Sequence, residues 1–93
     1  MNLYHTTQFK KDYKRIKKQN KDLSKFRAVI EKLVAGQSLG PQYGDHQLTG
    51  NWKGHRDCHI EPDWLLIYRR APDDLYLERT GSHSDLFKKQ FFC

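Results

Sequence analysis

The sequence has little of what marks secreted, membrane-bound or cofactor-dependent proteins. Only two of its 93 residues are cysteines, Cys58 and Cys93, which is too few for a disulfide scaffold. No apolar run approaches the roughly 18–20 residues of a membrane-spanning helix, and the first residues lack the apolar stretch of a signal peptide. The chain has no P-loop, GxSxG, CxxC or HExxH motif. We therefore expect a cytoplasmic protein that uses no metal and no nucleotide cofactor.

The chain does have an excess of positive charge. Lys and Arg number 17 against 11 Asp and Glu, which gives a formal net charge of +6 and a pI near 9.4. This balance favours a polyanionic partner, which is nucleic acid, an acidic protein or anionic lipid. Seven of the basic residues fall between positions 10 and 21. We interpret this run as the solvated face of a helix that also rests on phosphates.

The first half of the chain has the pattern of two amphipathic helices. Thr6 or Thr7 can cap the first helix, and Asp22 can cap the second, for which Gly36 is a plausible stop signal. The apolar side chains recur at helical spacing. They are Phe9, Tyr13 and Ile16 in the first helix, and Leu23, Phe26, Val29, Ile30 and Leu33 in the second. We expect a helical hairpin that follows a short strand at residues 2–5.

The second half has the pattern of a sheet, with aromatic and branched residues interrupted by turn residues. The expected elements are a strand at 52–60, a turn at Pro62-Asp63, a strand at 64–70, a turn at 71–74, a strand at 75–80 and a helix at 84–92. The sequence therefore predicts one α+β domain over residues 1–93. It has an N-terminal strand and a helical hairpin packed on an antiparallel sheet, and a short C-terminal helix.

The sheet half also holds four of the five histidines, which are His46, His55, His59 and His83. Because side chains alternate along a strand, His55, Asp57 and His59 would share one face. Cys58 and Ile60 would turn to the other face, toward the core. The polar set would then line the face that the helices leave open, unless it is only an ordinary solvated strand face.

These residue types suit the cleavage of RNA without a metal ion. RNA carries its own nucleophile, the 2′-hydroxyl. An RNase needs one group to remove that proton, another to protonate the 5′-oxygen, and a cation to stabilise the phosphorane. Histidine exchanges protons near neutral pH, and arginine matches the geometry of phosphate. A metal site made by His55, His59 and a carboxylate is the weaker interpretation, because the ligand spacing fits no known site.

Two segments resemble a known family. The first, His46 to Tyr68, carries the pattern H-x-L-x-G-x-W-x-G-x-R-D-x-H-x-E-P-D-W, and the second runs from Glu78 to Phe87. Both are similar to the YafQ family of toxins from bacterial type II toxin–antitoxin modules, within the RelE/ParE superfamily. The resemblance implies a RelE-like microbial ribonuclease fold. It also implies an mRNA interferase that cleaves messenger RNA in the ribosomal A site without a cofactor.

The resemblance further implies a catalytic set. Its members are His46, His59, Asp63, Arg79, His83 and Phe87. We hypothesise that His83 is the main proton-transfer residue, as the general acid, with Asp63 or His46 as the base. Arg79 would hold the scissile phosphate, and Phe87 would help to orient a base.

Partners follow from the charge and from the family together. We expect messenger RNA, the ribosome and a neutralising antitoxin of the DinJ or RelB kind, whose C-terminal segment covers the basic site face. We expect no membrane partner. Trp52 is expected in the core. Candidate RNA contacts outside the catalytic set are Lys10, Lys14, Lys17, Lys53, His55, Arg56 and Trp64.

Some features do not fit the family pattern smoothly. His55 stands where an aromatic residue such as Tyr is expected, and residues 88–93 run past the usual end. Strict alternation also places Arg79 on the same face as Leu75 and Leu77, whereas a catalytic arginine should face solvent. A bulge or a twist near the end of the strand would resolve this conflict, but the sequence does not show one.

Two other functions remain open. A ParE-like protein would share the fold and inhibit gyrase without cutting RNA, but such a surface has no need of proton-transfer groups. A non-catalytic RNA- or ribosome-binding domain would explain the charge and leave the histidines unexplained. Histidine-driven cleavage should fall on both sides of a pH optimum, while simple binding should weaken mainly with salt.

Overall fold

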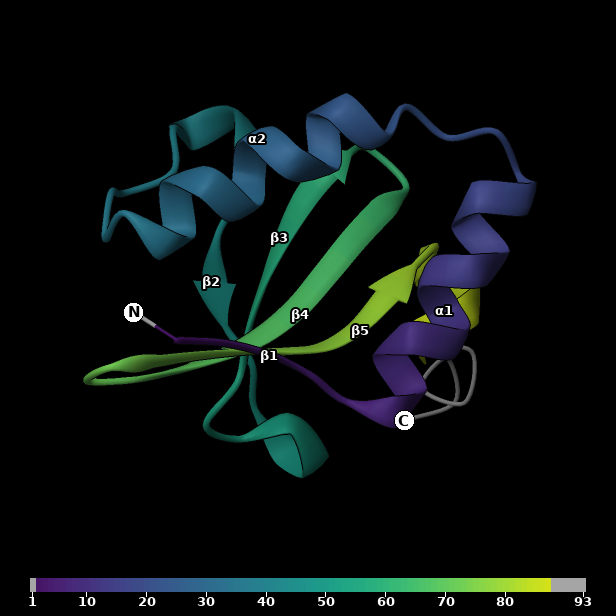
Figure 1. The fold of residues 1–93 in the computed structure, drawn as a ribbon. Helices are drawn as coiled ribbons and strands as arrows, with labels where there is room; N and C mark the ends of the chain where they lie inside the picture. Colours follow the sequence, from purple (N-terminus) through teal and green to yellow (C-terminus); the bar gives the residue numbers. More distant parts are fainter. Residues whose placement is uncertain (1, 88–93) are drawn as a thin grey trace.

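Five strands form one sheet, in the order β1-β5-β4-β3-β2. The computed structural model describes residues 2–87 (Figure 1). Its elements are β1 (Asn2–His5), α1 (Thr7–Lys18), α2 (Leu23–Val34), the 3-10 turn η1 (Pro41–Tyr43), β2 (His46–Gln47), the 3-10 turn η2 (Gly50–Trp52), β3 (Arg56–Glu61), β4 (Trp64–Ala71), β5 (Asp74–Gly81) and α3 (His83–Phe87). The α+β class is confirmed. The part of the expected closing helix at 88–92 lies outside the described residues.

The sheet is mixed rather than wholly antiparallel. The pairs β2–β3, β3–β4 and β4–β5 are antiparallel. The expected turns join β3 to β4 and β4 to β5. β1 pairs parallel with β5, with Leu3 opposite Leu75. Parallel neighbours need a long connection, and here the two helices and three further strands lie between the paired segments in the chain. The sequence predicted β1, β3, β4 and β5 but not the two-residue β2, and it could not predict this pairing.

The expected caps define the two long helices. The Thr6 hydroxyl accepts a hydrogen bond from the Phe9 backbone N–H at 3.0 Å, so Thr6 rather than Thr7 is the cap of α1. The Asp22 carboxylate accepts one from the Ser24 N–H at 3.0 Å at the start of α2. Gly36 follows the end of α2 with φ +76°, a conformation that favours glycine. These expectations are confirmed.

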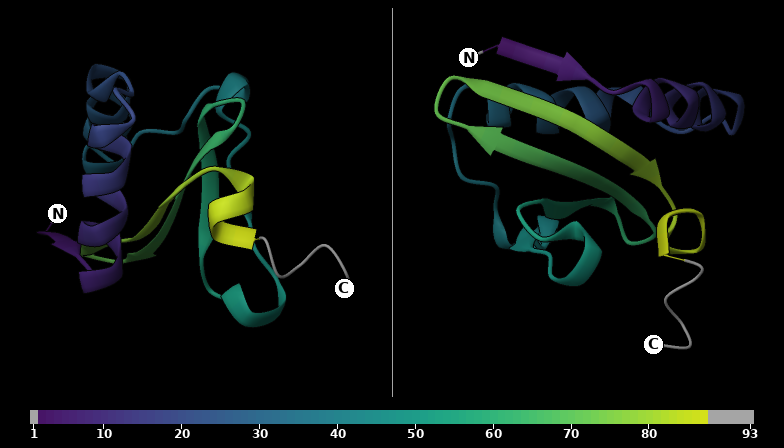
Figure 2. Two further views of the ribbon diagram at one scale, coloured as in Figure 1. Left: turned by 90° about the vertical axis from the view of Figure 1, so that its right-hand side faces the viewer. Right: turned by 90° about the horizontal axis from the view of Figure 1, so that it is seen from below.

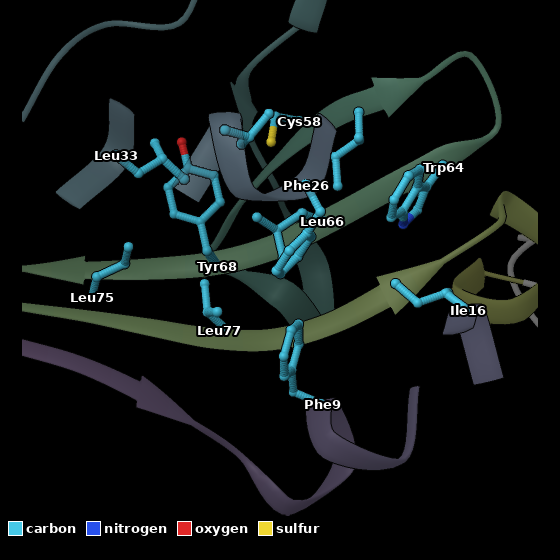
Figure 3. Packing of buried hydrophobic residues seen from close by; sticks show 12 residues of the cluster. Phe9, Ile16, Phe26, Leu33, Cys58, Trp64, Leu66, Tyr68, Leu75 and Leu77 are labelled. Atoms are coloured by element: carbon cyan, nitrogen blue, oxygen red, sulfur yellow. The ribbon is translucent and has the colours of Figure 1, made fainter. Parts of the chain in front are cut away.

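The main core lies between the two helices and one face of the sheet. Both helices lie on the same side of the strands (Figures 1 and 2). The expected apolar residues of α1 and α2 pack there against alternate residues of β3, β4 and β5 (Figure 3). The buried members of this cluster are Phe9, Ile16, Phe26, Val29, Leu33, Cys58, Ile60, Trp64, Leu66, Tyr68, Leu75 and Leu77.

The two tryptophans lie in environments that differ from those expected, which were the core for Trp52 and an RNA contact for Trp64. Trp64 is fully buried (0% exposed) and its ring stacks on Phe26 with centroids 6.4 Å apart. Its indole N–H donates to the Thr80 hydroxyl at 2.9 Å. The prediction that Trp64 contacts RNA is therefore wrong, because no base can reach the ring. Trp52 is half-buried in η2 rather than on a strand, because Gly50 and Gly54 adopt positive φ and delay β3.

A smaller apolar cluster covers part of the other face of the sheet. Leu65 and Ile67 of β4 pack there against Leu86 of α3, with Trp52 and Phe87 at the margin. Figure 2 shows α3 and η2 on the side of the strands opposite to α1 and α2. No helix within residues 2–87 is long and apolar enough to cross a membrane.

Candidate active site

The alternation expected along β3 is confirmed. Cys58 and Ile60 belong to the core under the helices. Asp57 and His59 point to the other face, where Asp57 pairs in register with Ile67 and His59 with Leu65. One detail differs from expectation. Asp57 is only 4% exposed, so it forms the floor of this face rather than its open surface.

A row of residues crosses four strands on this face. His46 of β2 is opposite Asp57 of β3, Asp57 is opposite Ile67 of β4, and Ile67 is opposite Arg79 of β5. The register between β4 and β5 shifts at this point, because Ile67 pairs with Arg79 and the next residue, Tyr68, pairs with Leu77. The extra residue brings Arg79 into the row of Asp57 while Leu77 stays in the core, so a β-bulge resolves the conflict that strict alternation posed for Arg79.

The contacts of the His46 ring are made by Nδ1 and leave Nε2 for a substrate. Its Nδ1 lies 2.9 Å from the Gly44 carbonyl oxygen and 3.0 Å from Asp57 Oδ1. A carbonyl oxygen only accepts hydrogen bonds, so Nδ1 carries the proton when it bonds to Gly44. In the neutral ring the lone pair then lies on Nε2. His46 is thus arranged to accept a proton at Nε2.

His83 forms a second histidine–carboxylate pair, with Asp63. Asp63 Oδ1 accepts from His83 Nδ1 at 2.6 Å and from the His83 backbone N–H at 2.9 Å. These two hydrogen bonds lower the pKa of Asp63, since they stabilise its charged form. Because Nδ1 of His83 is bound to Asp63, Nε2 is the ring nitrogen left to exchange a proton with a substrate.

His59 lies between these two dyads. Its ring centroid is 5.5 Å from that of His83. Gly44, whose carbonyl holds His46, also packs against His59: a Cβ placed on Gly44 would lie 3.1 Å from His59 Nδ1. A left-handed backbone at Gly44 (φ +56°) makes this close approach possible. The three histidines and Asp63 of the predicted set thus come together at one place.

Asp57 was placed on this face by the sequence but was not assigned to the catalytic set. Burial raises its pKa, and the nearby His46, His59 and His83 partly oppose that shift. Its Oδ1 has no hydrogen-bond partner within residues 2–87, although His46 Nδ1 lies 3.0 Å away. The spacing of two residues from His59 predicted its strand face, whereas its burial and its contact with His46 depend on the pairing of β3 with β2 and β4.

Arg79 and Phe87 lie at the sides of this cluster. The backbone of Arg79 lies two strands away from that of Asp57, which is about 9.5 Å across the sheet. Its guanidinium pairs with Asp12 of α1 at 2.7 Å. Phe87 is half-buried and packs against the cluster of Leu65, Ile67 and Leu86. Asp12 was missed. It is fully buried, three residues after Phe9 and four before Ile16, and so shares their helix face.

The remaining predicted RNA contacts lie in three different environments. Lys53 is exposed beside η2, on the side of the histidines, and stays a prediction. His55 is 19% exposed and lies 3.4 Å from Glu78. Arg56 faces the helix side, where Asp45 accepts from its Nε at 3.1 Å and from the Tyr68 hydroxyl at 2.8 Å. An RNA contact by His55 or Arg56 stays a prediction.

The lysines of α1 do not share a surface with the histidines. Lys10, Lys14 and Lys17 are exposed, but α1 lies on the opposite side of the sheet. RNA or ribosome contacts by these lysines stay a prediction, at a distance from the reacting bond. Within residues 2–87, no group of three or more His, Cys, Asp or Glu side chains is arranged to hold a metal ion.

Comparison with known proteins gives a consistent result. The family model described as the bacterial toxin of the type II toxin–antitoxin system, YafQ, matches residues 1–88. The chain belongs to the YafQ family. The mRNA interferase toxin YafQ of Escherichia coli (strain K12) is 43% identical over 84 residues, which cover 89% of this chain and 91% of that protein. Membership in a family of type II toxins is thus established.

Two solved structures match almost the whole chain. The crystal structure of a copper-bound L66S mutant toxin from Helicobacter pylori has a TM-score of 0.89 at 41% identity and covers 94% of this chain and 99% of that one. YafQ in the crystal structure of the E. coli DinJ–YafQ complex has a TM-score of 0.87 at 41% identity and covers 92% and 97%. The fold expected from the family resemblance is therefore confirmed.

Proposed function

We propose that this member of the YafQ family is an endoribonuclease that cuts messenger RNA with its own histidines, arginine and carboxylates. The observation that carries the proposal is that two histidines on one sheet face are each held at Nδ1, which leaves Nε2 of both rings for the substrate. One ring has its Nδ1 proton bound to the Gly44 carbonyl, and the other has its Nδ1 bound to the Asp63 carboxylate. The name of the E. coli relative, an mRNA interferase toxin, supports the same activity.

His46 is the general base of the proposed reaction. Of the two groups that the sequence leaves open for this role, Asp63 is the poorer acceptor, because hydrogen bonds from His83 lower its pKa. His46 Nε2 removes the proton of the 2′-hydroxyl, and the 2′-oxygen forms a bond to phosphorus. Asp57, 3.0 Å from His46 Nδ1, helps to hold the ring and to stabilise its protonated form.

His83 is the general acid. As the bond from phosphorus to the 5′-oxygen breaks, His83 Nε2 gives its proton to the departing oxygen. The products are a 2′,3′-cyclic phosphate and a free 5′-hydroxyl, so protons and electrons balance without a metal or a redox partner. Arg79 stabilises the charge on the phosphorane, and Phe87 helps to orient a base.

The partners of the proposed reaction follow from charge and family. Messenger RNA on the ribosome, in the cytoplasm, is the proposed substrate, and the basic surface of α1 would add salt-dependent attraction to RNA. The E. coli YafQ has been crystallised with DinJ. We expect a related antitoxin for this chain, which covers the face of His46, His59 and His83.

A substrate with one 2′-deoxy position tests the proposal. A messenger is loaded on ribosomes and mixed with the purified chain, and the cut is mapped on an all-ribose message. Replacing the 2′-hydroxyl before that cut with hydrogen should abolish cleavage there, while a deoxy position elsewhere should have no effect. The same cut on the deoxy substrate would contradict the proposed nucleophile. Prior dialysis of the protein against a chelator should leave the rate unchanged.

A further inference from the structure

Asp12 is a buried carboxylate that has no role in the proposed reaction. It is 0% exposed and lies on the helix face that packs against β5. It accepts hydrogen bonds from Arg79 Nε at 2.7 Å and Nη2 at 3.3 Å, and from the Thr80 backbone N–H at 3.2 Å. It also accepts from Arg15 Nη2 at 3.1 Å and Gln8 Nε2 at 3.4 Å.

The contacts with Arg79 use one edge of its guanidinium group. Nε donates to Oδ2 and Nη2 to Oδ1, a two-point pairing that fixes the plane of the group. Nη1 donates to none of the residues 2–87 in the described hydrogen bonds, and the side chain is 21% exposed. The edge formed by Nη1 and the second hydrogen of Nη2 is therefore free to bind two oxygens of a phosphate.

The same carboxylate also fixes the backbone from which Arg79 projects. β1 pairs with β5 only as far as Leu77, so the outer edge of β5 is uncovered by a strand beyond that residue. Asp12 satisfies the Thr80 N–H at this edge, directly after Arg79 and just beyond the bulge. One side chain thus holds both the guanidinium and the peptide next to it.

We propose that Asp12 is a positioning residue for cleavage: it holds Arg79 by one guanidinium edge so that the other edge meets the scissile phosphate. This inference rests on the proposed function, because it gives Asp12 no role except through Arg79. A purely structural Asp12 would make the same contacts, but it would only hold α1 against β5. The two roles differ in how the effects of substitutions at Asp12 and Arg79 combine.

A double-mutant cycle separates these roles. Single-turnover cleavage of a messenger on ribosomes is measured for the wild-type chain, Asp12→Asn, Arg79→Ala and the double variant. Asparagine keeps the shape of the side chain and removes its charge. Val29→Ala, on the buried face of α2, is the control for lost stability. All proteins are assayed well below the lowest unfolding temperature in the set.

The inference predicts that Asp12→Asn slows cleavage about tenfold or more in the wild-type background. In the Arg79→Ala background it should cause no further loss, because Asp12 acts only through Arg79. Val29→Ala, although destabilised, should cleave at the wild-type rate. An equal loss in both backgrounds, or none in either, would overturn the role of Asp12. If the wild-type chain itself makes no cut, the proposed function fails and this inference fails with it.

Discussion

At the scale of single residues, the site is a set of polar groups whose protonation is controlled by short contacts. Asp63 binds the Nδ1 of His83 at 2.6 Å, and the Gly44 carbonyl binds the Nδ1 of His46 at 2.9 Å. Both rings therefore keep Nε2 for the substrate. In the proposed function His46 accepts a proton at this atom and His83 donates one.

We expect Asp57 to lower the stability of the fold and to support RNA cleavage. Because burial raises its pKa above the unfolded value, the ionised carboxylate opposes folding at pH values above the raised pKa. Asp57→Asn removes that cost, so we expect the unfolding temperature at pH 7 to rise by about 2–4 °C. The gain should shrink as the pH falls through the raised pKa, since the wild-type Asp57 then takes up its proton. Cleavage should be slower, because His46 loses its charged neighbour.

Thermal unfolding of both proteins across this pH range, with cleavage rates at pH 7, checks the prediction. A variant that is less stable than the wild type at pH 7, with no dependence of the difference on pH, would show that the buried charge stabilises the fold instead.

A side chain at Gly44 should displace His59, and the same substitution at Gly36 is a matched control. Both adopt left-handed φ values, so alanine should cost about 1 kcal/mol of unfolding free energy at either position. Only at Gly44 would the new Cβ meet a site residue, 3.1 Å from His59 Nδ1, while at Gly36 it meets nothing within 4 Å. We expect Gly44→Ala to slow cleavage about tenfold and Gly36→Ala to leave it unchanged. Equal rates for the two variants would show that His59 tolerates the displacement.

At the scale of elements, the bulge in β5 decides where Arg79 lies. The Thr6 hydroxyl, which caps α1, also donates to the carbonyl of the bulged residue Glu78 at 3.0 Å. The start of α1 and the irregular part of β5 are thus joined by one side chain. A local feature of the helix therefore supports the geometry of the site.

Thr6→Ala should consequently differ from a comparable change at the second helix. Loss of either cap, Thr6 or Asp22, should lower the unfolding free energy by about 1–2 kcal/mol in chemical denaturation. Only Thr6→Ala should also slow cleavage, since Asp22 contacts Ser24 and no residue of the site. If both variants cleave as fast as the wild type at a temperature where they are folded, the bulge does not need Thr6.

The elements were largely predictable from the sequence, while their pairing was not. Helical spacing and caps predicted α1 and α2, and turn residues predicted the β3–β4–β5 meander, because these signals are local. The parallel pairing of β1 with β5 joins residues far apart in the sequence. Trp64 was misjudged for the same reason: nothing near it in the chain shows that Phe26 will cover its ring.

The site was predicted where the chemistry is carried by recognisable residue types. His46, His59, Asp63 and His83 come together as the family resemblance implies. Asp12 was missed, and Asp57 was placed on the correct face without a role, because a buried carboxylate is recognised by its partners and those partners lie on other elements. The position of Asp12 on the inward face of α1 was the only available signal.

At the scale of the whole molecule, the sheet separates two surfaces with different tasks. One side carries α1 with its exposed lysines, and the other carries the histidines with α3 and η2. In the proposed function, the first surface adds attraction to RNA that falls with salt, and the second cuts the chain. An antitoxin needs to cover only the second surface to stop the reaction.

The central claim is that this toxin cuts messenger RNA and that His83 supplies a proton. The most direct test is induced expression in bacteria of the wild-type chain beside His83→Ala, with the 5′ ends of a reporter messenger mapped. The account predicts growth arrest with new in-frame cuts for the wild type and no cuts for the variant. Arrest without cuts would contradict RNA cleavage and favour a ParE-like action on gyrase. Cuts that persist in His83→Ala would contradict the role of that residue.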